Sequence, residues 1–288
     1  MSKKLLVLFL CLALLTPVCA LGETAFTDFS EAFPDQFLAA GETPVKTDTL
    51  YQSENIRLEI SVTRVNNSDV YVADLYLKTV EPFQRAFGGG KWRTKMQSVK
   101  TIATDSGAIL ALTGDNAHNF NVGWVIANGE VKRKTANNKR DLLILYKNGE
   151  MATIAGSKLK NSEMAAAAEG IWQTFLFGPA LLKDGAAIEK FSSGVSPANP
   201  RAAIGYYAPG HYCLVQVDGR GTKSAVESGK KNTGMTLKQL SAFMAELGCT
   251  VAYNLDGGQS ALMWYNGQVV SNPYKGGRSI GDIVIIKE

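Results

Sequence analysis

Residues 250–260 read Thr-Val-Ala-Tyr-Asn-Leu-Asp-Gly-Gly-Gln-Ser, and the interpretation of the whole chain starts from this stretch. An apolar run of β-forming residues that stops at an acid and two glycines predicts a buried strand, followed by a tight loop that carries Asp256. A simple hairpin needs only one glycine, so Gly258 suggests that a ligand comes close to the backbone there. Asp256 is therefore the first candidate for a functional residue.

The helix before this strand belongs to a pattern that occurs twice. Residues 236–248 begin with a capping box and keep an apolar stripe up to a glycine, which predicts a helix. Residues 94–107 repeat the pattern, with Thr94 as the predicted N-cap, and a strand at residues 108–112 follows. This earlier copy leads to Asp115, so the chain contains two units of helix, glycine, strand and acid.

A third acid follows another predicted strand. Residues 212–217 are apolar and β-forming, and they run into Asp218. A strand, a helix and a further strand within about 45 residues suggest a crossover that joins parallel strands. Such a crossover puts Asp218 and Asp256 at the same edge of the sheet, where open α/β sheets bind ligands. If the two strands are instead antiparallel, the acids lie at opposite ends.

Hairpin signals dominate the rest of the chain. Alternating runs at residues 56–62 and 70–77 flank an Asn-Asn-Ser turn, and similar signals occur at residues 128–129, 148–149, 184–185, 209–210 and 266–267. Residues 162–175 predict one more helix, and residues 279–286 predict a final strand. We therefore predict an α+β fold: a mixed, largely antiparallel β-sheet core with several hairpins and a few flanking helices, in a single domain.

The amino-terminal residues have the layout of a secretory signal peptide. Residues 1–20 begin with Lys3 and Lys4, continue with an apolar run and end in small residues. The run is short for a bilayer span, so we expect secretion or export to the cell envelope, with no stable membrane anchor; an uncleaved anchor is the alternative. Residues 21–50 show no clear period and predict a spacer or arm, which leaves residues 51–288 as the domain.

Composition excludes some classes of function. The chain has 30 Lys and Arg against 26 Asp and Glu, and this near balance argues against a nucleic-acid partner, which requires a concentrated basic face. The two histidines, His118 and His211, do not have the spacing of a zinc centre or a Ser-His-Asp triad. Cys213 and Cys249, which remain after removal of the signal peptide, either form one disulfide or stay as buried free thiols.

Carboxylates and arginines at strand ends and turns are the candidates for chemistry: Asp115, Asp218, Asp256, Arg201, Arg220 and Arg278. Carboxylates bind sugar hydroxyls and stabilise oxocarbenium character, whereas Arg guanidinium groups bind phosphate oxygens in a fork geometry. The amides of Gly257 and Gly258 can hold an anion. This set suits a ligand that is both a sugar and a phosphate. An isolated Asp-Gly after a strand is more often a turn, so Asp218 by itself carries little weight.

The order of several motifs gives a more specific signal. They are Thr-Gly-Asp at 113–115, Phe-Gly-Pro-Ala-Leu at 177–181, Asn-Pro-Arg at 199–201, Val-Asp-Gly-Arg at 217–220, Asn-Leu-Asp-Gly-Gly-Gln-Ser at 254–260, Asn-Pro at 272–273 and Gly-Arg at 277–278. From about Lys95 to the C-terminus the chain resembles the phosphodiester glycosidase family. The resemblance implies that the site contains Asp115, Arg201, Asp218, Arg220, Asp256, Gly257, Gly258 and Ser260. Gln259 stands where many members have a third glycine.

The resemblance implies an exported hydrolase that cleaves the glycosidic bond of sugar 1-phosphodiesters in glycans or cell-envelope polymers. Asp256 is expected to act as base or nucleophile, Asp115 and Asp218 as supporting carboxylates, and the three arginines as phosphate clamps. The sequence requires no cofactor; a divalent-metal-assisted phosphodiesterase using calcium or magnesium is one alternative. A non-catalytic cell-envelope glycan-binding protein is the other. In each case the expected partner is a glycan or a sugar phosphate.

Overall fold

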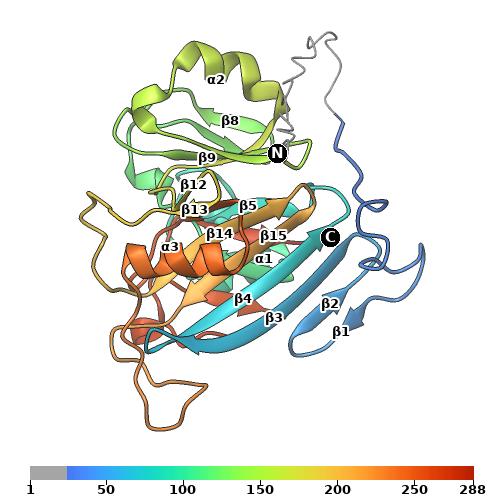
Figure 1. Cartoon of the computed structure of the whole chain (residues 1–288). Coiled ribbons are helices and arrows are strands. Elements are labelled where there is room, and N and C mark those ends of the chain that lie inside the picture. Colours follow the sequence, from blue (N-terminus) through green and yellow to red (C-terminus); the bar gives the residue numbers. More distant parts are fainter. Residues whose placement is uncertain (1–24) are drawn as a thin grey trace, which may run out of the picture.

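Two β-sheets packed face to face form the centre of the protein, whose residues 25–288 are described by a computed structural model (Figure 1). The signal peptide predicted at residues 1–20 lies outside these residues. The larger sheet has the order β1 (Val45–Lys46), β2 (Leu50–Gln52), β3 (Ile56–Val65), β4 (Ser68–Leu77), β15 (His211–Val217), β14 (Arg201–Ala208) and β16 (Val251–Asn254). The second sheet has the order β18 (Gln268–Val269), β17 (Met263–Tyr265), β6 (Leu110–Thr113), β19 (Asp282–Ile286) and β5 (Phe83–Phe87).

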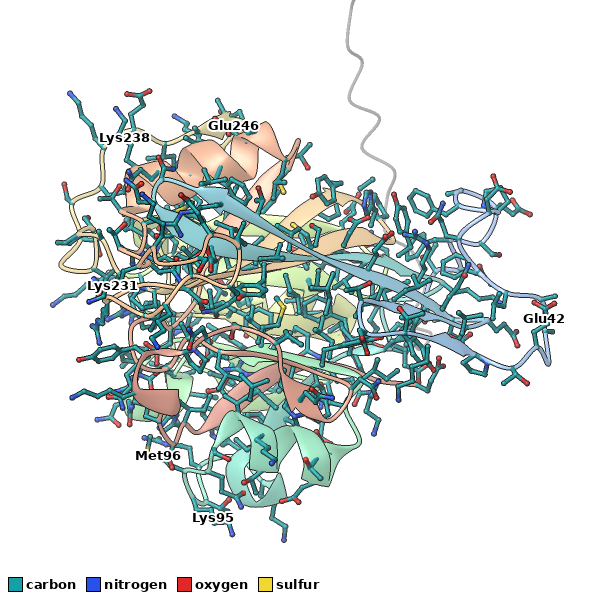
Figure 2. All side chains as sticks on the ribbon, turned by 90° about the horizontal axis from the view of Figure 1, so that it is seen from below. Glu42, Lys95, Met96, Lys231, Lys238 and Glu246 are labelled. Atoms are coloured by element: carbon teal, nitrogen blue, oxygen red, sulfur yellow. The ribbon has the colours of Figure 1, made fainter. Side chains whose placement is uncertain are left out.

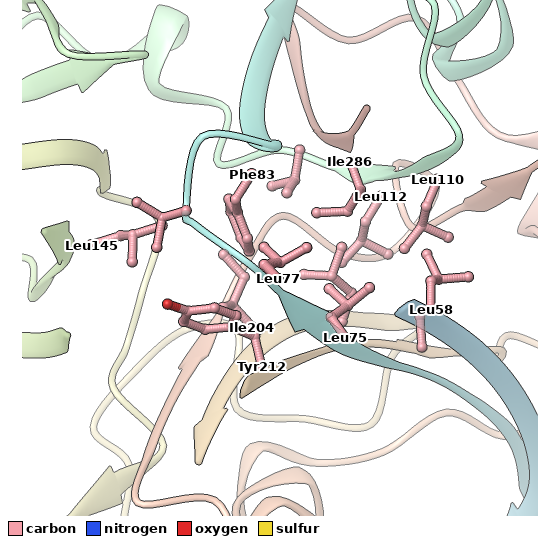
Figure 3. Close-up of a cluster of buried hydrophobic side chains, with 14 of the residues drawn as sticks. Leu58, Leu75, Leu77, Phe83, Leu110, Leu112, Leu145, Ile204, Tyr212 and Ile286 are labelled. Atoms are coloured by element: carbon pink, nitrogen blue, oxygen red, sulfur yellow. The ribbon is translucent and has the colours of Figure 1, made fainter. Parts of the chain in front are cut away.

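Apolar side chains from both sheets fill the space between them. Leu75 and Leu77 of β4 lie in one cluster with Leu112 of β6 and Ile286 of β19, and all four are fully buried (Figure 3). Alternation along the strand sends odd-numbered residues of β4 into this core. Burial of each such side chain contributes about 1.5 to 3 kcal/mol relative to exposure.

Two helices cover the outer faces of the sheets. Helix α3 (Leu237–Glu246) packs Leu240 and Met244 against the larger sheet, and its capping box at Thr236 is as predicted. Helix α1 (Val99–Ser106) covers the second sheet. Its N-cap is Ser98, whose hydroxyl accepts a hydrogen bond from the Thr101 amide, so the predicted start at Thr94 is wrong.

The residues before Ser98 form hydrogen bonds with neighbouring segments instead of joining the helix. Thr94 donates from its hydroxyl to the carbonyl O of Gly88 at 2.7 Å, and Gln97 forms a β-bridge with Ile280. Met96, which the predicted helical stripe would have buried, is 47% exposed and lies at the rim of the protein (Figure 2). These tertiary contacts prevent residues 94–97 from joining the helix.

A smaller layer lies beside the central pair of sheets. It contains a sheet of β10 (Met151–Ile154), β9 (Leu142–Tyr146) and β11 (Ile171–Phe175), the hairpin of β7 (Val125–Ala127) with β8 (Glu130–Arg133), and helix α2 (Asn161–Ala167). The hairpin of β12 (Leu182–Lys183) with β13 (Ala186–Ala187) packs instead against α3 and β16. Short 3-10 turns occur at Gly88–Gly90, Ala117–Asn119, Gly156–Lys158, Ala168–Gly170 and Tyr274–Gly276. The helix predicted up to residue 175 is therefore too long. The apolar, β-branched and aromatic residues of β11 are buried, and the strand pairs antiparallel with β9 instead.

The observed architecture confirms the predicted α+β class, because antiparallel sheets with several hairpins form the core of a single domain. Within residues 25–50, Phe29 packs into the core against the turns at Gly149 and Gly210. No helix in the described part of the chain is long and apolar enough to cross a bilayer. Cys213 and Cys249 are free thiols, with their Sγ atoms 3.8 Å apart.

The register of three strands positions the candidate acids. Strand β14 lies between β15 and β16 and is antiparallel to both, so β15 and β16 run in the same direction. Asp218 and Asp256, which follow these strands, therefore lie at the same edge, as predicted. Arg201 begins β14 at that edge, where it pairs with Val217.

Candidate active site

Asp256 is held where the two central sheets meet. Its amide donates a hydrogen bond to the carbonyl O of Gly114 at 3.1 Å, which links the end of β16 to the end of β6. Gly114 has no room for a side chain, because a Cβ atom there would lie 2.1 Å from Asp282 Oδ2. The two predicted units of helix, strand and acid thus converge at this point.

The Asp256 carboxylate faces a cavity of about 410 Å³. Arg278 donates from Nη2 to Asp256 Oδ2 at 3.0 Å and from Nε to Ser260 Oγ at 2.6 Å. Asp256 Oδ1 accepts the amide of Gly257 at 3.0 Å. Asp256 itself is only 7% exposed, whereas the Arg278 side chain is 47% exposed. A fixed carboxylate therefore lies beside a cation that water and ligands can reach.

Arg201 lines the same cavity from the start of β14. Its Nε donates to the carbonyl O of Met235 at 2.8 Å and its Nη2 donates to that of Val195 at 2.7 Å. No carboxylate among the described residues pairs with it. Burial lowers its pKa to about 10, so the guanidinium stays charged at neutral pH. Arg201 is therefore a buried charge in the cavity wall that backbone carbonyl groups hold in place without a carboxylate.

Arg220 is the third arginine that lines the cavity. Asn199 Oδ1 accepts hydrogen bonds from Arg220 Nε at 3.1 Å and from Nη2 at 2.9 Å, and the guanidinium lies 5.4 Å from the ring centroid of Tyr274. Arg220 also explains the second glycine of the loop. A Cβ atom on Gly258 would lie 2.9 Å from Arg220 Nη2, and Gly258 has a φ of +62°. A protein side chain therefore lies close to Gly258, and the predicted approach of a ligand stays a prediction.

The predicted anion cradle of backbone amides differs from the observed loop. The Gly258 amide donates to the carbonyl O of Pro200 at 2.9 Å, and the Gly257 amide donates to Asp256 Oδ1. A Cβ atom on Gly257 would lie 2.6 Å from the same Pro200 oxygen. Both amides are engaged within the protein, so the cationic groups that line the cavity are the side chains of Arg201, Arg220 and Arg278.

Asp115 lies behind the cavity and does not line it. It is completely buried and forms an ion pair with Arg85. Nη2 of Arg85 contacts Asp115 and also lies 2.9 Å from Asp282 Oδ2. Asp115 Oδ2 accepts the Leu176 amide at 2.7 Å. Burial raises the pKa of Asp115 to about 6, against the opposing charge of Arg85. Through Leu176, Asp115 positions the loop that brings Phe177 to the cavity.

Asp218 also lies beneath the surface, at the edge shared with Asp256. It is 1% exposed, and its Oδ2 accepts the amide of Asn272 at 2.9 Å. Burial raises its pKa to about 6, and the hydrogen bond from Asn272 only partly offsets this effect. Asp218 therefore holds a loop near the site and does not face the cavity.

The raised pKa of Asp218 predicts a pH-dependent stability. The folded state binds this proton more tightly than the unfolded state, whose pKa is near 3.8, so the stabilisation present below pH 4 is lost as the pH rises through 6. We expect Asp218→Asn to remove this loss, which amounts to about 2 to 3 kcal/mol by pH 7. Urea unfolding at pH 4, 5, 6 and 7 measures it. Asp105→Asn, at an exposed position of α1, is the control, and parallel pH profiles for wild type and Asp218→Asn would contradict the prediction.

The donor set around the cavity is unfavourable for a divalent cation. Asp256 is the only carboxylate among the described residues that line the cavity, and three arginines line it as well. Residues 25–288 contain no group of three or more His, Cys, Asp or Glu side chains placed to hold a metal ion. Calcium and magnesium bind six or more oxygen ligands, most often carboxylates and carbonyls. The arrangement instead suits an anionic ligand.

Sequence reasoning missed several residues at or behind the cavity. Asn199 and Phe177 line it, and Arg85 and Asp282 form the ion pairs behind it. Asn199 and Phe177 lie in the motifs that carried the family resemblance, so motif order could have identified them. Arg85 offered one local signal, because it is a charge at an inward position of an alternating strand.

Comparisons with known proteins identify the family and the fold. A phosphodiester glycosidase family model matches residues 100–287. The catalytic domain of zebrafish N-acetylglucosamine-1-phosphodiester alpha-N-acetylglucosaminidase, auto-inhibited by its pro-peptide, has a TM-score of 0.62 and 18% identity, and the match covers 92% of this chain and 94% of that one. No curated protein sequence matches the chain.

Two bacterial structures share the fold. A hypothetical protein from Synechocystis has a TM-score of 0.60 and 13% identity over 86% of this chain, which spans 64% of that protein. A protein from Burkholderia pseudomallei has a TM-score of 0.51 and 14% identity, with 76% of this chain and 74% of that one covered. The family model includes every residue that lines the cavity of Asp256, and the chain belongs to the phosphodiester glycosidase family.

Proposed function

We propose that the protein is an exported hydrolase that cleaves the glycosidic bond of sugar 1-phosphodiesters in glycans or cell-envelope polymers. The observation that carries the proposal is the cavity in which one carboxylate, Asp256, lies among three arginines. Family membership supports the reaction class, and the name of the zebrafish enzyme supports a sugar 1-phosphodiester as the kind of substrate. The signal-peptide pattern of residues 1–20 supports action outside the cytoplasm.

The charges in the cavity match the two sides of the scissile bond. Cleavage between the anomeric carbon and the phosphate oxygen leaves the electron pair on a phosphate monoester, which is a stable anion and needs little protonation. Arg201 and Arg220 bind that phosphate. Asp256 has one of two roles at the anomeric carbon. It either bonds to this carbon as a nucleophile or, as a base, accepts a proton from the water that attacks it. The anomeric configuration of the released sugar distinguishes these two roles.

A panel of sugar 1-phosphodiesters, assayed with and without a chelator in water labelled with oxygen-18, tests the proposal. We expect hydrolysis that persists in chelator, because the arginine-rich donor set is poor for a divalent cation, and we expect the label in the sugar. Activity that requires calcium or magnesium, or label in the phosphate, would instead favour a metal-assisted phosphodiesterase. Ligand binding without any turnover would favour a glycan-binding protein.

A further inference from the structure

A second cavity adjoins the one that contains Asp256. Its volume is about 920 Å³, and it shares Phe177 and Gly194 with the smaller cavity. The turn at residues 136–141 and the loop at residues 177–179 form most of its other walls. The two cavities therefore lie side by side, and the proposed reaction at Asp256 uses only one of them.

Hydrogen bonds fix the walls of the second cavity to the site. Arg140 Nη1 donates to the carbonyl O of Phe177 at 2.7 Å, and Asp141 Oδ2 accepts the amide of Ala180 at 3.0 Å. Tyr253 of β16 donates from its hydroxyl to the carbonyl O of Asp141 at 2.6 Å. Asp256 follows this strand directly, so the position of the second cavity relative to that carboxylate is set by the fold.

The charges of the second cavity are unbalanced. Lys139 is exposed and forms no ion pair with any residue of the described chain, and Arg140 has no carboxylate partner there either. The one acid in the lining, Asp141, already accepts a backbone amide. Arg201 in the smaller cavity likewise lacks a carboxylate partner. Cations without carboxylate partners in two adjoining cavities attract an extended anion.

We propose that Lys139 and Arg140 bind a second phosphate of the substrate, on the side of the scissile phosphate that faces away from the sugar. The preferred substrate class is then a chain of repeated phosphodiesters. Lys and Arg are the side chains that bind phosphate most strongly, Lys as a point charge and Arg as a fork. The inference rests on the proposed hydrolysis of sugar 1-phosphodiesters.

Two compounds with the same sugar 1-phosphate test it: one esterified to glycerol, the other to glycerol phosphate. We expect wild type to favour the second compound by about tenfold in kcat/KM, and Lys139→Ala to bring this ratio close to one. Lys183→Ala, at an exposed position that lines neither cavity, is the matched control and should keep the wild-type ratio. The preference should also weaken as salt is added.

Calorimetry with Asp256→Asn gives a second readout without turnover. Tighter binding of the two-phosphate compound that depends on Lys139 supports the second site, even if neither compound is hydrolysed and the proposed function fails. Equal kcat/KM values for the two compounds, or equal affinities, overturn the second site. If both compounds are nevertheless hydrolysed, the proposed function stands. A ratio that Lys139→Ala does not change also overturns it.

Discussion

Replacement of Asp256 by asparagine is expected to reduce kcat for a sugar 1-phosphodiester about 1,000-fold. Asparagine keeps the size of the side chain but removes the negative charge and the proton acceptor. Arg278, which lies 3.0 Å from Asp256 Oδ2, then also loses its ionic partner. Initial rates with saturating substrate measure the effect, and a near-wild-type unfolding midpoint shows that the fold is intact.

A matched control separates this effect from the general loss of an aspartate. Asp184 is an exposed turn residue with a φ of 52°, a conformation that asparagine tolerates well, and it does not line the cavity. Asp184→Asn should keep the wild-type kcat. Retained turnover in a correctly folded Asp256→Asn variant would end the assignment of Asp256 as the essential carboxylate.

Replacement of Arg85 by methionine is expected to lower the free energy of unfolding by about 3 to 5 kcal/mol at pH 7.5. Arg85 is buried between Asp115 and Asp282 and also donates to the carbonyl O of Thr174 at 2.9 Å. Methionine fills much of the volume but leaves two buried carboxylates without a counter-charge. Urea unfolding monitored by tryptophan fluorescence measures the loss.

The pH dependence and a surface control identify the cause. Against the effect of burial, the charge of Arg85 lowers the pKa of Asp282 to about 2, so without Arg85 this acid must be protonated to stay buried. The destabilisation by Arg85→Met should therefore be smaller at pH 4.5 than at pH 7.5. Arg57→Met breaks a partly exposed pair with Glu59 and should cost less than about 1 kcal/mol. Equal losses for the two variants would contradict a role for burial.

The features that could be predicted from the sequence depend on nearby residues. The capping box at Thr236 and the hairpin at Asn128 need only contacts within a few positions, and both are observed. The sequence also predicted that Asp218 and Asp256 lie at the same edge of the sheet, because one helix between two strands limits the relative direction of those strands. Local chemistry and crossover geometry were enough for these.

The features that escaped prediction depend on partners far along the chain. The local sequence around Asp115 resembles that around Asp256, since each acid follows an apolar strand. The environment of Asp115, however, is set by Arg85, which is 30 residues away in the sequence, and by Asp282, which is 167 residues away. The start of α1 depends on whether Thr94 or Ser98 caps it, and contacts with Gly88 decided this. No single strand or turn contains that information.

The hydrogen bond from the Asp256 amide to Gly114 makes activity a reporter of assembly. It joins the ends of strands from two different sheets, so neither sheet alone fixes the carboxylate in its cavity. A folding intermediate with both sheets formed but not yet docked would be inactive. During renaturation, the return of turnover should therefore coincide with sheet docking and follow the recovery of secondary structure.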